Sequence, residues 1–359
     1  MKKTVYNFLA FGLFFLLLTF LACSEGRIDD TWTLRPRDIR EGEGENDIPA
    51  INEPRFAAPA DVDFLTDSSM VLGLNIGGTL RAYPLDILYW HEIVNDEIAD
   101  SLVAVTYSTL TGSGVAFHRR IDNNISFKLR VSGLLYRNNL IVLDDLYESH
   151  WVQFQRLGVS GSRSNENLEE FPIIEINWKT WQLLFPNSEV LTTRTGFNRP
   201  YGTYPYGDYQ TDDTNFFFGD TSLFNLTKHL YSFSNPISFK DRVLGIIVGE
   251  DAKVYPFSAF PKTGIGIIED EFRGEQIIVI GSQEANLLVA YRRTRTDGSI
   301  ASFEVVDSEK LLIKDERGVE FDVFGKTTNN ISAENLNAIR SNIGYCFAWL
   351  LFYPNVEVY

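Results

Sequence analysis

The sequence predicts an α+β protein, rich in β-structure, in which one unit of mainly antiparallel sheet with short helices occurs twice. Of the residues, 44% are hydrophobic and 14% are aromatic, with 27 Phe and 16 Tyr, and aromatic residues are enriched in strands. Short alternating stretches follow one another between Gly and Pro turns, with few segments suited to crossover helices, so neighbouring strands are expected to pair antiparallel. The third observation is an internal repeat, because several blocks of the first half recur in the second half in the same order.

This repeat defines the expected domain organisation. The recurring blocks are 71–77 with 243–249, 81–84 with 253–256, 96–97 with 270–271, 103–105 with 277–279, 116–119 with 290–293 and 181–190 with 349–358. Their order is kept and their spacing is nearly constant, which chance similarity rarely produces. We therefore expect a first repeat unit over 49–190, a Tyr/Gly/Pro-rich insert over 191–240 and a second repeat unit over 241–359.

Each unit is expected to open with two strands joined by a Gly turn, the second of which ends at Tyr-Pro. Proline suits the first turn of a helix, so a helix is predicted from Pro84 to Val94. Its spacing places Ile87, His91 and Val94 on one face. Further strands are predicted at 102–107, 114–119, 125–131 and 139–144, and a second helix at 177–185.

The N-terminus has the pattern of a bacterial lipoprotein signal. Two lysines precede an apolar run over 8–21, and Ala22-Cys23 follows directly before polar residues, which is typical of a signal peptide that ends at a lipobox. Residues 1–22 are therefore the expected signal peptide and Cys23 the expected lipidation site. The alternative, an uncleaved anchor, needs about 20 apolar residues, more than this run contains. Either way we expect a membrane-attached protein of the cell envelope, at the outer membrane or facing the periplasm.

The charge and the remaining residues exclude some partners. Residues 23–48 are expected to form an acidic flexible tether, because the Glu/Gly run at 41–47 offers little apolar surface. The formal charge is −16, or −18 without the two lysines of the leader, so no nucleic-acid partner is expected. Cys346 lies in an apolar run and is expected to be a buried thiol. No cofactor is expected.

Two stretches of the first unit have no counterpart in the second. One contains His91 and Glu92, where the second unit has Thr263–Gly266 and no titratable group. The other is a turn of hydroxyl and glycine residues that contains Ser108 and Thr111. These four side chains are the candidate site, since such a group can hold a nucleophile with its base or a small polar ligand. The alternative is a turn whose hydroxyls bond their own backbone, with the histidine satisfied beneath the sheet.

Five stretches carry a family resemblance: Trp90–Asp96, Val105–Tyr107, Val131–Leu135, Glu148–Trp151 and Thr195–Gly202. They resemble the bacterial domain-of-unknown-function family 3179, and the likeness covers about 48–359. Members of that family typically have Tyr-Cys-Pro-Leu-Cys-Gly where this chain has Tyr-Ser-Thr-Leu-Thr-Gly at 107–112. Two such thiolates would suit a soft metal or a thiol redox step, whereas Ser108 and Thr111 suit neither. The resemblance thus implies a divergent member with the family's fold and site location, and without a metal.

The insert provides a second candidate site. Tyr201, Tyr204 and Tyr206, with Arg199 nearby, are the candidate ligand-binding residues, because clustered aromatic rings and polar groups suit a sugar or a peptide. The alternative is a loop that wraps the seam between the two units and buries its rings.

Two functions follow from these patterns. The favoured one is a non-enzymatic envelope lipoprotein that binds an unknown small ligand, a glycan or another envelope protein through a degenerate family site. The alternative is an envelope enzyme, either a hydrolase using Ser108 with His91 and Glu92, or a metal-dependent enzyme using His91, Glu92 and His150. No Gly-x-Ser-x-Gly elbow surrounds Ser108, which argues against the hydrolase.

Overall fold

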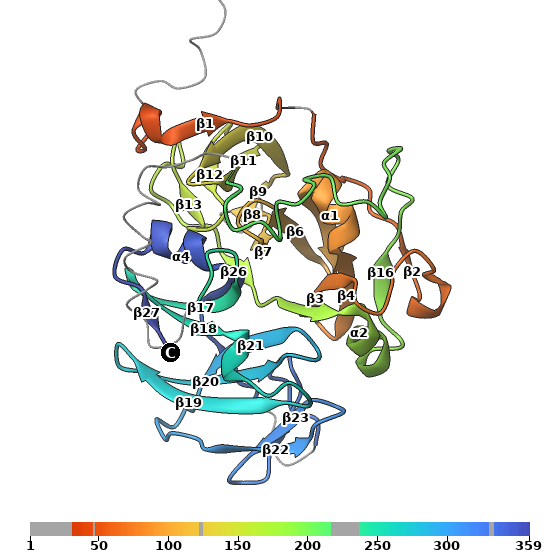
Figure 1. Cartoon of the computed structure of the whole chain (residues 1–359), viewed down its shortest axis with the longest axis vertical. Coiled ribbons are helices and arrows are strands. Elements are labelled where there is room, and N and C mark those ends of the chain that lie inside the picture. The colour runs from red at the N-terminus through yellow and green to blue at the C-terminus, as the bar shows by residue number, and fades with distance from the viewer. Residues whose placement is uncertain (1–30, 46, 122–124, 217–236, 330–333) are drawn as a thin grey trace, which may run out of the picture.

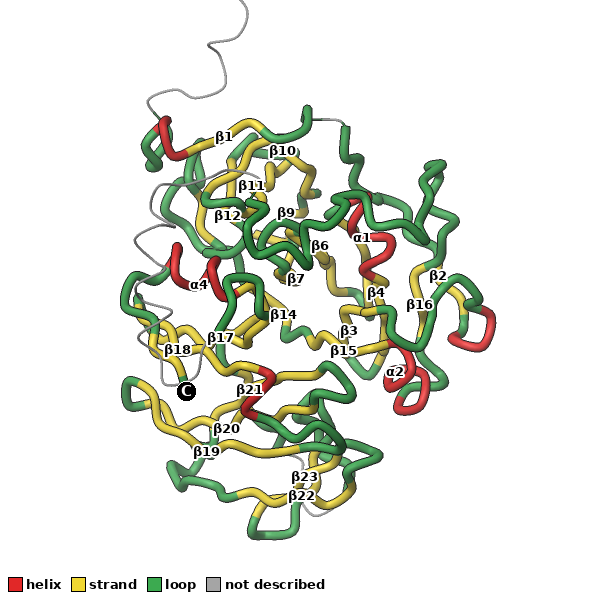
Figure 2. The backbone as a smooth tube through the Cα atoms, in the orientation of Figure 1, coloured by secondary structure: helices red, strands yellow, loops and turns green. Residues whose placement is uncertain are grey.

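The computed structural model describes residues 31–45, 47–121, 125–216, 237–329 and 334–359. Strands dominate this part of the chain, and its three α-helices have seven residues each (Figure 2). The helices are α1 (Leu85–His91), α2 (Trp178–Leu184) and α4 (Cys346–Phe352), and the 3-10 turns are η1 (Pro36–Asp38), η2 (Pro59–Asp61) and η3 (Phe257–Ala259). The predicted β-rich α+β class is confirmed. The expected signal peptide and Cys23 lie outside the described residues.

The first unit contains three larger sheets. One has the strand order β15 (Ile174–Asn177), β3 (Met70–Ile76), β4 (Thr79–Pro84), β16 (Glu189–Leu191) and β2 (Phe56–Ala57). The next has the order β14 (Glu170–Phe171), β7 (Ser113–His118), β6 (Ser101–Ser108) and β5 (Ile93–Ile98). The third has the order β1 (Ile39–Glu41), β10 (Leu129–Tyr136), β11 (Asn139–Asp144), β12 (His150–Val152) and β13 (Leu157–Gly158), and β8 (Arg120–Ile121) pairs with β9 (Ile125–Ser126).

The second unit also contains three sheets, which Figure 1 shows in cyan and blue. The first has the order β26 (Ser341–Tyr345), β17 (Arg242–Val248), β18 (Asp251–Pro256) and β27 (Glu357–Val358). The second has the order β19 (Gly266–Phe272), β20 (Glu275–Ser282), β21 (Leu287–Arg292) and β25 (Asn337–Ala338), and the third β22 (Phe303–Asp307), β23 (Leu312–Asp315) and β24 (Glu320–Phe321).

The opening sheets of the two units have the same topology. Strands β3 and β4 pair antiparallel with Val71 opposite Pro84, and β17 and β18 pair with Val243 opposite Pro256. In each unit a third strand joins the outer edge of the first, a seven-residue helix follows it, and a short strand then lies parallel to the second. The hairpins and the terminal helices that repeat in sequence therefore repeat in structure.

Equivalent side chains make equivalent contacts in the two units. The Tyr83 hydroxyl donates a hydrogen bond to Asp96, and the Tyr255 hydroxyl donates one to Asp270 at 2.8 Å. Two residues before each tyrosine, a basic side chain of the same strand pairs with the same carboxylate. This residue is Arg81 in the first unit and Lys253 in the second. Because both units keep this arrangement, it belongs to the scaffold.

The helix after Tyr83-Pro84 is shorter than predicted. It ends at His91, because Glu92 adopts a left-handed conformation with φ 55° and ψ −25°. Val94, expected on the helix face, lies in β5 and is fully buried there. The predicted strand at 125–131 also divides, into β9 and the start of β10, whereas β11 has the bounds that were predicted.

The expected tether is structured where it meets the body of the protein. Residues 36–38 form η1, and β1 adds to the edge of the sheet with Ile39 opposite Tyr136. Ile39 is only 5% exposed, and Trp32 and Leu34 pack against the same cluster, so apolar side chains before the polar Glu/Gly run attach this part of the expected tether. This attachment leads the chain past the end of α1.

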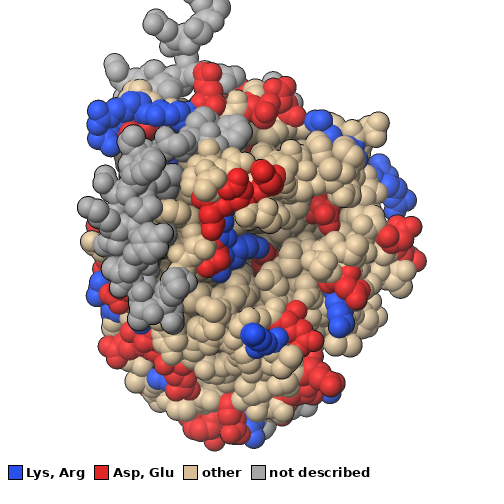
Figure 3. Space-filling model, in the orientation of Figure 1, with Lys and Arg blue, Asp and Glu red and all other residues tan. Residues whose placement is uncertain are grey.

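The two units share a hydrophobic core. Phe154 of the first unit lies with its ring 4.7 Å from that of Trp349 on α4, and 4.8 Å from that of Phe352. Cys346 is buried in the same cluster, and burial raises the pKa of its thiol to about 12. On the face shown in Figure 3, acidic side chains are spread widely and Lys and Arg occur singly or in small groups among them. None of the described helices is long and apolar enough to cross a membrane.

Candidate functional site

The end of α1 positions the first pair of candidate residues. The Glu92 amide donates to the Leu88 carbonyl at 2.7 Å and closes the helix, and the Glu92 carbonyl accepts from the Tyr107 amide of β6 at 2.8 Å. A left-handed conformation is uncommon for a residue other than glycine and is retained only where the surroundings hold it. The helix end and the neighbouring strand therefore fix Glu92 from two sides.

His91 is fully buried, and both of its ring nitrogens are hydrogen-bonded. Nδ1 lies 2.7 Å from the Pro49 carbonyl and Nε2 lies 2.8 Å from the Tyr201 hydroxyl. A carbonyl oxygen only accepts, so Nδ1 carries the proton and Nε2 accepts from the tyrosine. Burial lowers the pKa of His91, which favours this neutral form. His91 therefore links α1 to the insert and has no free nitrogen for a metal or for a nucleophile.

Glu92 is the buried acid of the site. Its side chain is 6% exposed, and burial raises its pKa to about 8. The Tyr206 hydroxyl lies 3.4 Å from Oε1, while Oε2 has no hydrogen bond to any described residue. Since its pKa lies above neutral, the carboxyl is mostly protonated at pH 7.

Ser108 and Thr111 face a different set of groups. The Ser108 hydroxyl accepts from the Leu140 amide at 3.1 Å, and the Thr111 hydroxyl accepts from the Asn139 side chain at 3.0 Å. Gln153 bonds the same asparagine at 2.8 Å. Neither hydroxyl is hydrogen-bonded to His91 or Glu92, so the nucleophile–base contact of the hydrolase alternative is not formed. Asn139 and Gln153 complete this buried network, and no sequence motif had singled them out.

The aromatic insert and the end of α1 form one region. The Trp90 indole donates to the Thr203 carbonyl at 3.1 Å, and the Tyr204 ring packs 4.9 Å from that of Tyr89 on α1. Figure 1 shows the green segment after β16 passing beside α1. The insert also reaches the second unit, because the Tyr209 ring lies 6.4 Å from that of Tyr345.

Beside these contacts lies a cavity of about 720 Å³ that is open to solvent on one side, which we call the α1 cavity. Its walls come from the segment after β1, the end of α1, the hairpin of β10 and β11, and the insert. The lining residues are Gly42, Glu43, Asp47, Ile48, Tyr89, Trp90, Glu92, Leu110, Val131, Gly133, Leu134, Leu135, Leu140, Arg199, Pro205, Tyr206, Tyr209 and Asn215. Of the candidate residues, Glu92, Arg199 and Tyr206 line it, whereas His91, Ser108, Thr111, Tyr201 and Tyr204 do not. Its size and mixed lining are typical of small-molecule sites.

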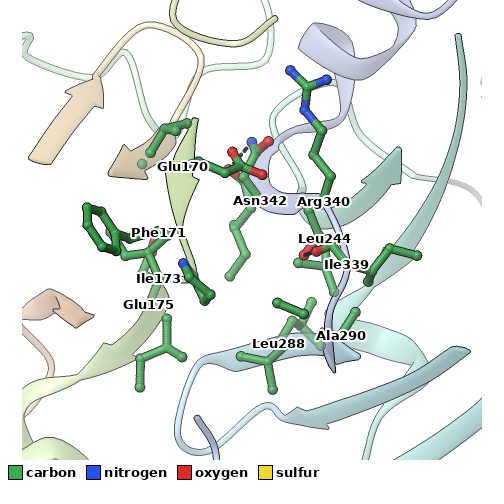
Figure 4. A pocket seen from close by; sticks show the side chains of 18 of the residues that line it. Glu170, Phe171, Ile173, Glu175, Leu244, Leu288, Ala290, Ile339, Arg340 and Asn342 are labelled. Atoms are coloured by element: carbon green, nitrogen blue, oxygen red, sulfur yellow. Dashed lines mark hydrogen bonds between the residues drawn. The ribbon is translucent and has the colours of Figure 1, made fainter. Parts of the chain in front are cut away.

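A smaller cavity of about 220 Å³ lies at the seam between the two units (Figure 4). Glu170 and Asn342 lie at one end of it and Leu288 and Ala290 at the other, and the guanidinium of Arg340 points away. The Asn342 side-chain oxygen is buried and has no hydrogen-bond partner among the described residues. The cavity is less than a third of the volume of the α1 cavity, and it contains none of the candidate residues.

The metal-dependent alternative needs His91, Glu92 and His150 together. The His150 ring has its Nδ1 2.7 Å from the Ser160 hydroxyl, and its centroid lies 4.6 Å from that of Trp32, with the two rings tilted by 40°. In the described part of the chain, no group of three His, Cys, Asp or Glu side chains could hold a metal ion. The structure therefore does not assemble that ligand set.

Fold and site together define a β-rich protein whose two units have opening sheets of the same topology, with a cavity that is lined by the buried acid Glu92. The chain belongs to the family described as protein of unknown function (DUF3179), whose model matches residues 45–356. The resemblance predicted from the sequence motifs is thus confirmed. No curated protein matches this chain, and no solved structure does.

Proposed function

We propose that this protein is a cell-envelope lipoprotein that binds a small ligand in the α1 cavity without catalysing a reaction on it. The observation that carries the proposal is Glu92, a carboxyl held in a left-handed turn at the wall of a 720 Å³ cavity, with one oxygen that no described residue bonds. Keeping an acid buried without a full set of partners destabilises the fold. Such a cost is typical of functional sites.

The side chains around Glu92 favour binding over catalysis. Acid–base catalysis is compatible with a pKa of about 8, but the other groups that the enzyme alternative needs are engaged elsewhere. The Ser108 hydroxyl accepts a hydrogen bond from a backbone amide, and both ring nitrogens of His91 are hydrogen-bonded. The cavity instead offers apolar and aromatic walls with a few polar groups, which suits recognition.

A substitution that fills the α1 cavity tests this proposal. Gly42 lies in its wall without a positive φ, and a Cβ there would lie 3.2 Å from the Leu135 side chain. We expect the small-molecule fraction of a cell-envelope extract to raise the melting temperature of the wild-type full chain, because a ligand that binds only the folded state stabilises it. Gly42→Trp should abolish that increase.

The matched control is Gly202→Trp in the insert, where a Cβ meets no atom within 4 Å. It should keep the wild-type response to the extract. No response of the wild type, or an equal response of the Gly42→Trp variant, would contradict ligand binding in this cavity.

Attachment to the membrane is proposed to occur through a lipid on Cys23. The apolar run, the lipobox and the polar segment that follows support it. Cells that express the wild type should incorporate a fatty-acid analogue into the protein, and cells that express Cys23→Ser should not. Labelling of the Cys23→Ser protein would disprove lipidation at this residue.

A further inference from the structure

The charged groups of the α1 cavity are unbalanced in sign. Three carboxyl groups line it, those of Glu43, Asp47 and Glu92, and one cation, Arg199. The Arg199 guanidinium donates to the Asp47 carbonyl at 3.1 Å and lies 5.9 Å from the centroid of the Trp90 ring. It thus lies at the wall, where it compensates only part of the negative charge. The Lys240 ammonium over the Tyr209 ring adds a second cation, so the negative charge is in excess only once Glu92 has ionised, and an anionic ligand would then meet more repulsion than attraction.

The same cavity is lined by four aromatic rings, those of Tyr89, Trp90, Tyr206 and Tyr209. The faces of such rings attract cations, and more strongly where water is excluded. Lys240 already uses one of them from within the protein, with its ammonium 3.5 Å from the Tyr209 centroid. Tyr89 packs against the rings of Tyr107 and Tyr204, and Tyr206 against that of Tyr204, but neither Tyr89 nor Tyr206 has a cation over its ring among the described residues, and both line the cavity.

Glu92 supplies the third element, an acid without a counter-ion. Its only hydrogen bond is the long one to Tyr206, and no described cation pairs with it. Glu92 lines the cavity. A positive group placed beside the rings would therefore reach a carboxyl that gains a partner by losing its proton.

From these three features we infer that the α1 cavity binds an organic ammonium ion, with the charged nitrogen between Glu92 and the rings of Tyr89 and Tyr206. The apolar side of the cavity, formed by Leu134, Leu135 and Leu140, would hold the hydrocarbon part. This inference rests on the proposed function and adds the chemical class of the ligand.

Binding of a cation beside Glu92 should release the proton of this carboxyl. The free protein holds Glu92 protonated up to about pH 8, and a cation at contact distance lowers that pKa. Binding must then release a proton, so the affinity rises with pH until the pKa of the free carboxyl is passed and is constant above it. The other titratable or charged groups that line the cavity are Glu43, Asp47, Tyr89, Arg199, Tyr206 and Tyr209. The pKa values of the tyrosines are raised by burial, so they stay protonated across this pH range.

A pair of probes of equal shape separates charge from size. Choline and 3,3-dimethyl-1-butanol differ by one nitrogen in place of a carbon, and benzyltrimethylammonium has a corresponding uncharged carbon analogue. Isothermal titration of the full chain in an uncharged detergent should show at least tenfold tighter binding of one or both cations than of the isosteres at pH 8.5. That ratio corresponds to about 1.4 kcal/mol. Titration in two buffers of different ionisation enthalpy should show release of up to one proton near pH 7.

Glu92→Gln tests the role of the acid. The variant should bind the cation about tenfold more weakly at pH 8.5 and without proton release, and should bind the uncharged isostere as the wild type does. Glu250→Gln changes an exposed glutamate in the turn between β17 and β18 and should change none of these values.

Three results would overturn the inference: no cation binds more tightly than its isostere, the cation binds more weakly as pH rises from 6 to 8.5, or Glu92→Gln binds it like the wild type. If the isostere binds equally well, or if the envelope extract stabilises the wild type but not Gly42→Trp, ligand binding in the cavity stands and only the cationic class is wrong. If neither the probes nor the extract bind, both proposals fail.

Discussion

Glu92 should make the stability of this protein fall as the pH rises through the neutral range. Burial raises its pKa from 4.5 to about 8, so the folded protein binds a proton there that the unfolded chain has released. For an acid whose folded pKa is raised, the stability is complete below the unfolded pKa and is lost progressively up to the folded pKa. The window of loss is therefore pH 4.5 to 8.

The size of this loss follows from the two pKa values. Each unit of difference corresponds to about 1.4 kcal/mol of unfolding free energy, so the rise to about 8 costs at most about 5 kcal/mol above pH 8. Local opening of the cavity to water would reduce the cost, which makes this value an upper limit. Even half of it is a large part of a typical folding free energy of about 5–15 kcal/mol.

The substitution that removes the effect is Glu92→Gln, which keeps the shape and the hydrogen bond with Tyr206 but cannot ionise. Urea unfolding of both proteins between pH 4 and 9 should give similar free energies at pH 4 and a variant that is several kcal/mol more stable at pH 9. The pKa of His91 is lowered by its own burial, but that titration is common to both proteins and cancels in the difference. Glu250→Gln serves as the exposed control. Parallel profiles of the wild type and Glu92→Gln would show that this carboxyl ionises as it does in the unfolded chain.

Two further pairs of substitutions test the repeated scaffold. Gly245→Ala should destabilise the protein by about 1–3 kcal/mol in urea unfolding, because its Cβ would lie 2.3 Å from the buried Trp349 ring. Gly202→Ala is the control, with open space around the new Cβ, and should change the unfolding free energy by less than about 0.5 kcal/mol. Equal effects of the two substitutions would refute the close contact. Tyr83→Phe should cost about 1.5–3 kcal/mol as the loss of a hydrogen bond to a charged acceptor, and Tyr255→Phe should cost less, because its aspartate is 18% exposed against 5% for that of Tyr83. A larger cost for Tyr255→Phe would contradict this ordering by burial.

The parts of the fold that could be predicted are those with local signals. The Gly turns and the Tyr-Pro corner at Pro84 and Pro256 appear in both copies of the sequence, and the structure has equivalent hairpins at both places. Strand β11 was predicted to the residue, since β-branched and aliphatic residues lie between two turns. The helix at 178–184 was predicted within one residue at each end, with Asn177 as its N-cap.

The helix end at His91 could not be predicted in the same way. Ile87, His91 and Val94 fit a helical period, but Val94 lies in β5, the edge strand of its sheet, where Ile51 bridges it and it is fully buried. Burial on both faces of a strand erases the alternation that would have distinguished it from a helix. The left-handed turn at Glu92 is held by the carbonyl–amide contact with Tyr107, which is a tertiary interaction.

The candidate site was predicted as separate parts. His91 with Glu92, and the tyrosines of the insert, were singled out for different reasons, and the hydrogen bonds His91–Tyr201 and Glu92–Tyr206 join them across about 110 residues of chain. Loop placement of this kind depends on packing and not on local sequence. The hydroxyl turn at 108–111 was predicted to form one site with His91. The Ser108 hydroxyl instead accepts a hydrogen bond from the Leu140 amide, which favours the alternative that the hydroxyls of this turn bond the backbone.

The repeat explains why the cavity occurs in one unit. Asp96 and Asp270 accept from equivalent tyrosines and are 174 residues apart, so the same offset places Glu92 opposite Gly266. A side chain at Gly266 would have its Cβ 2.6 Å from the Pro261 ring, so the second unit closes over this position with backbone and proline. In the first unit, the corresponding space is left to a buried acid and is walled by the insert, which has no counterpart in the second unit. The scaffold therefore tolerates both a filled and an open form at this point. Only the open form exposes a carboxyl to a cavity, which is the feature on which the ammonium site depends.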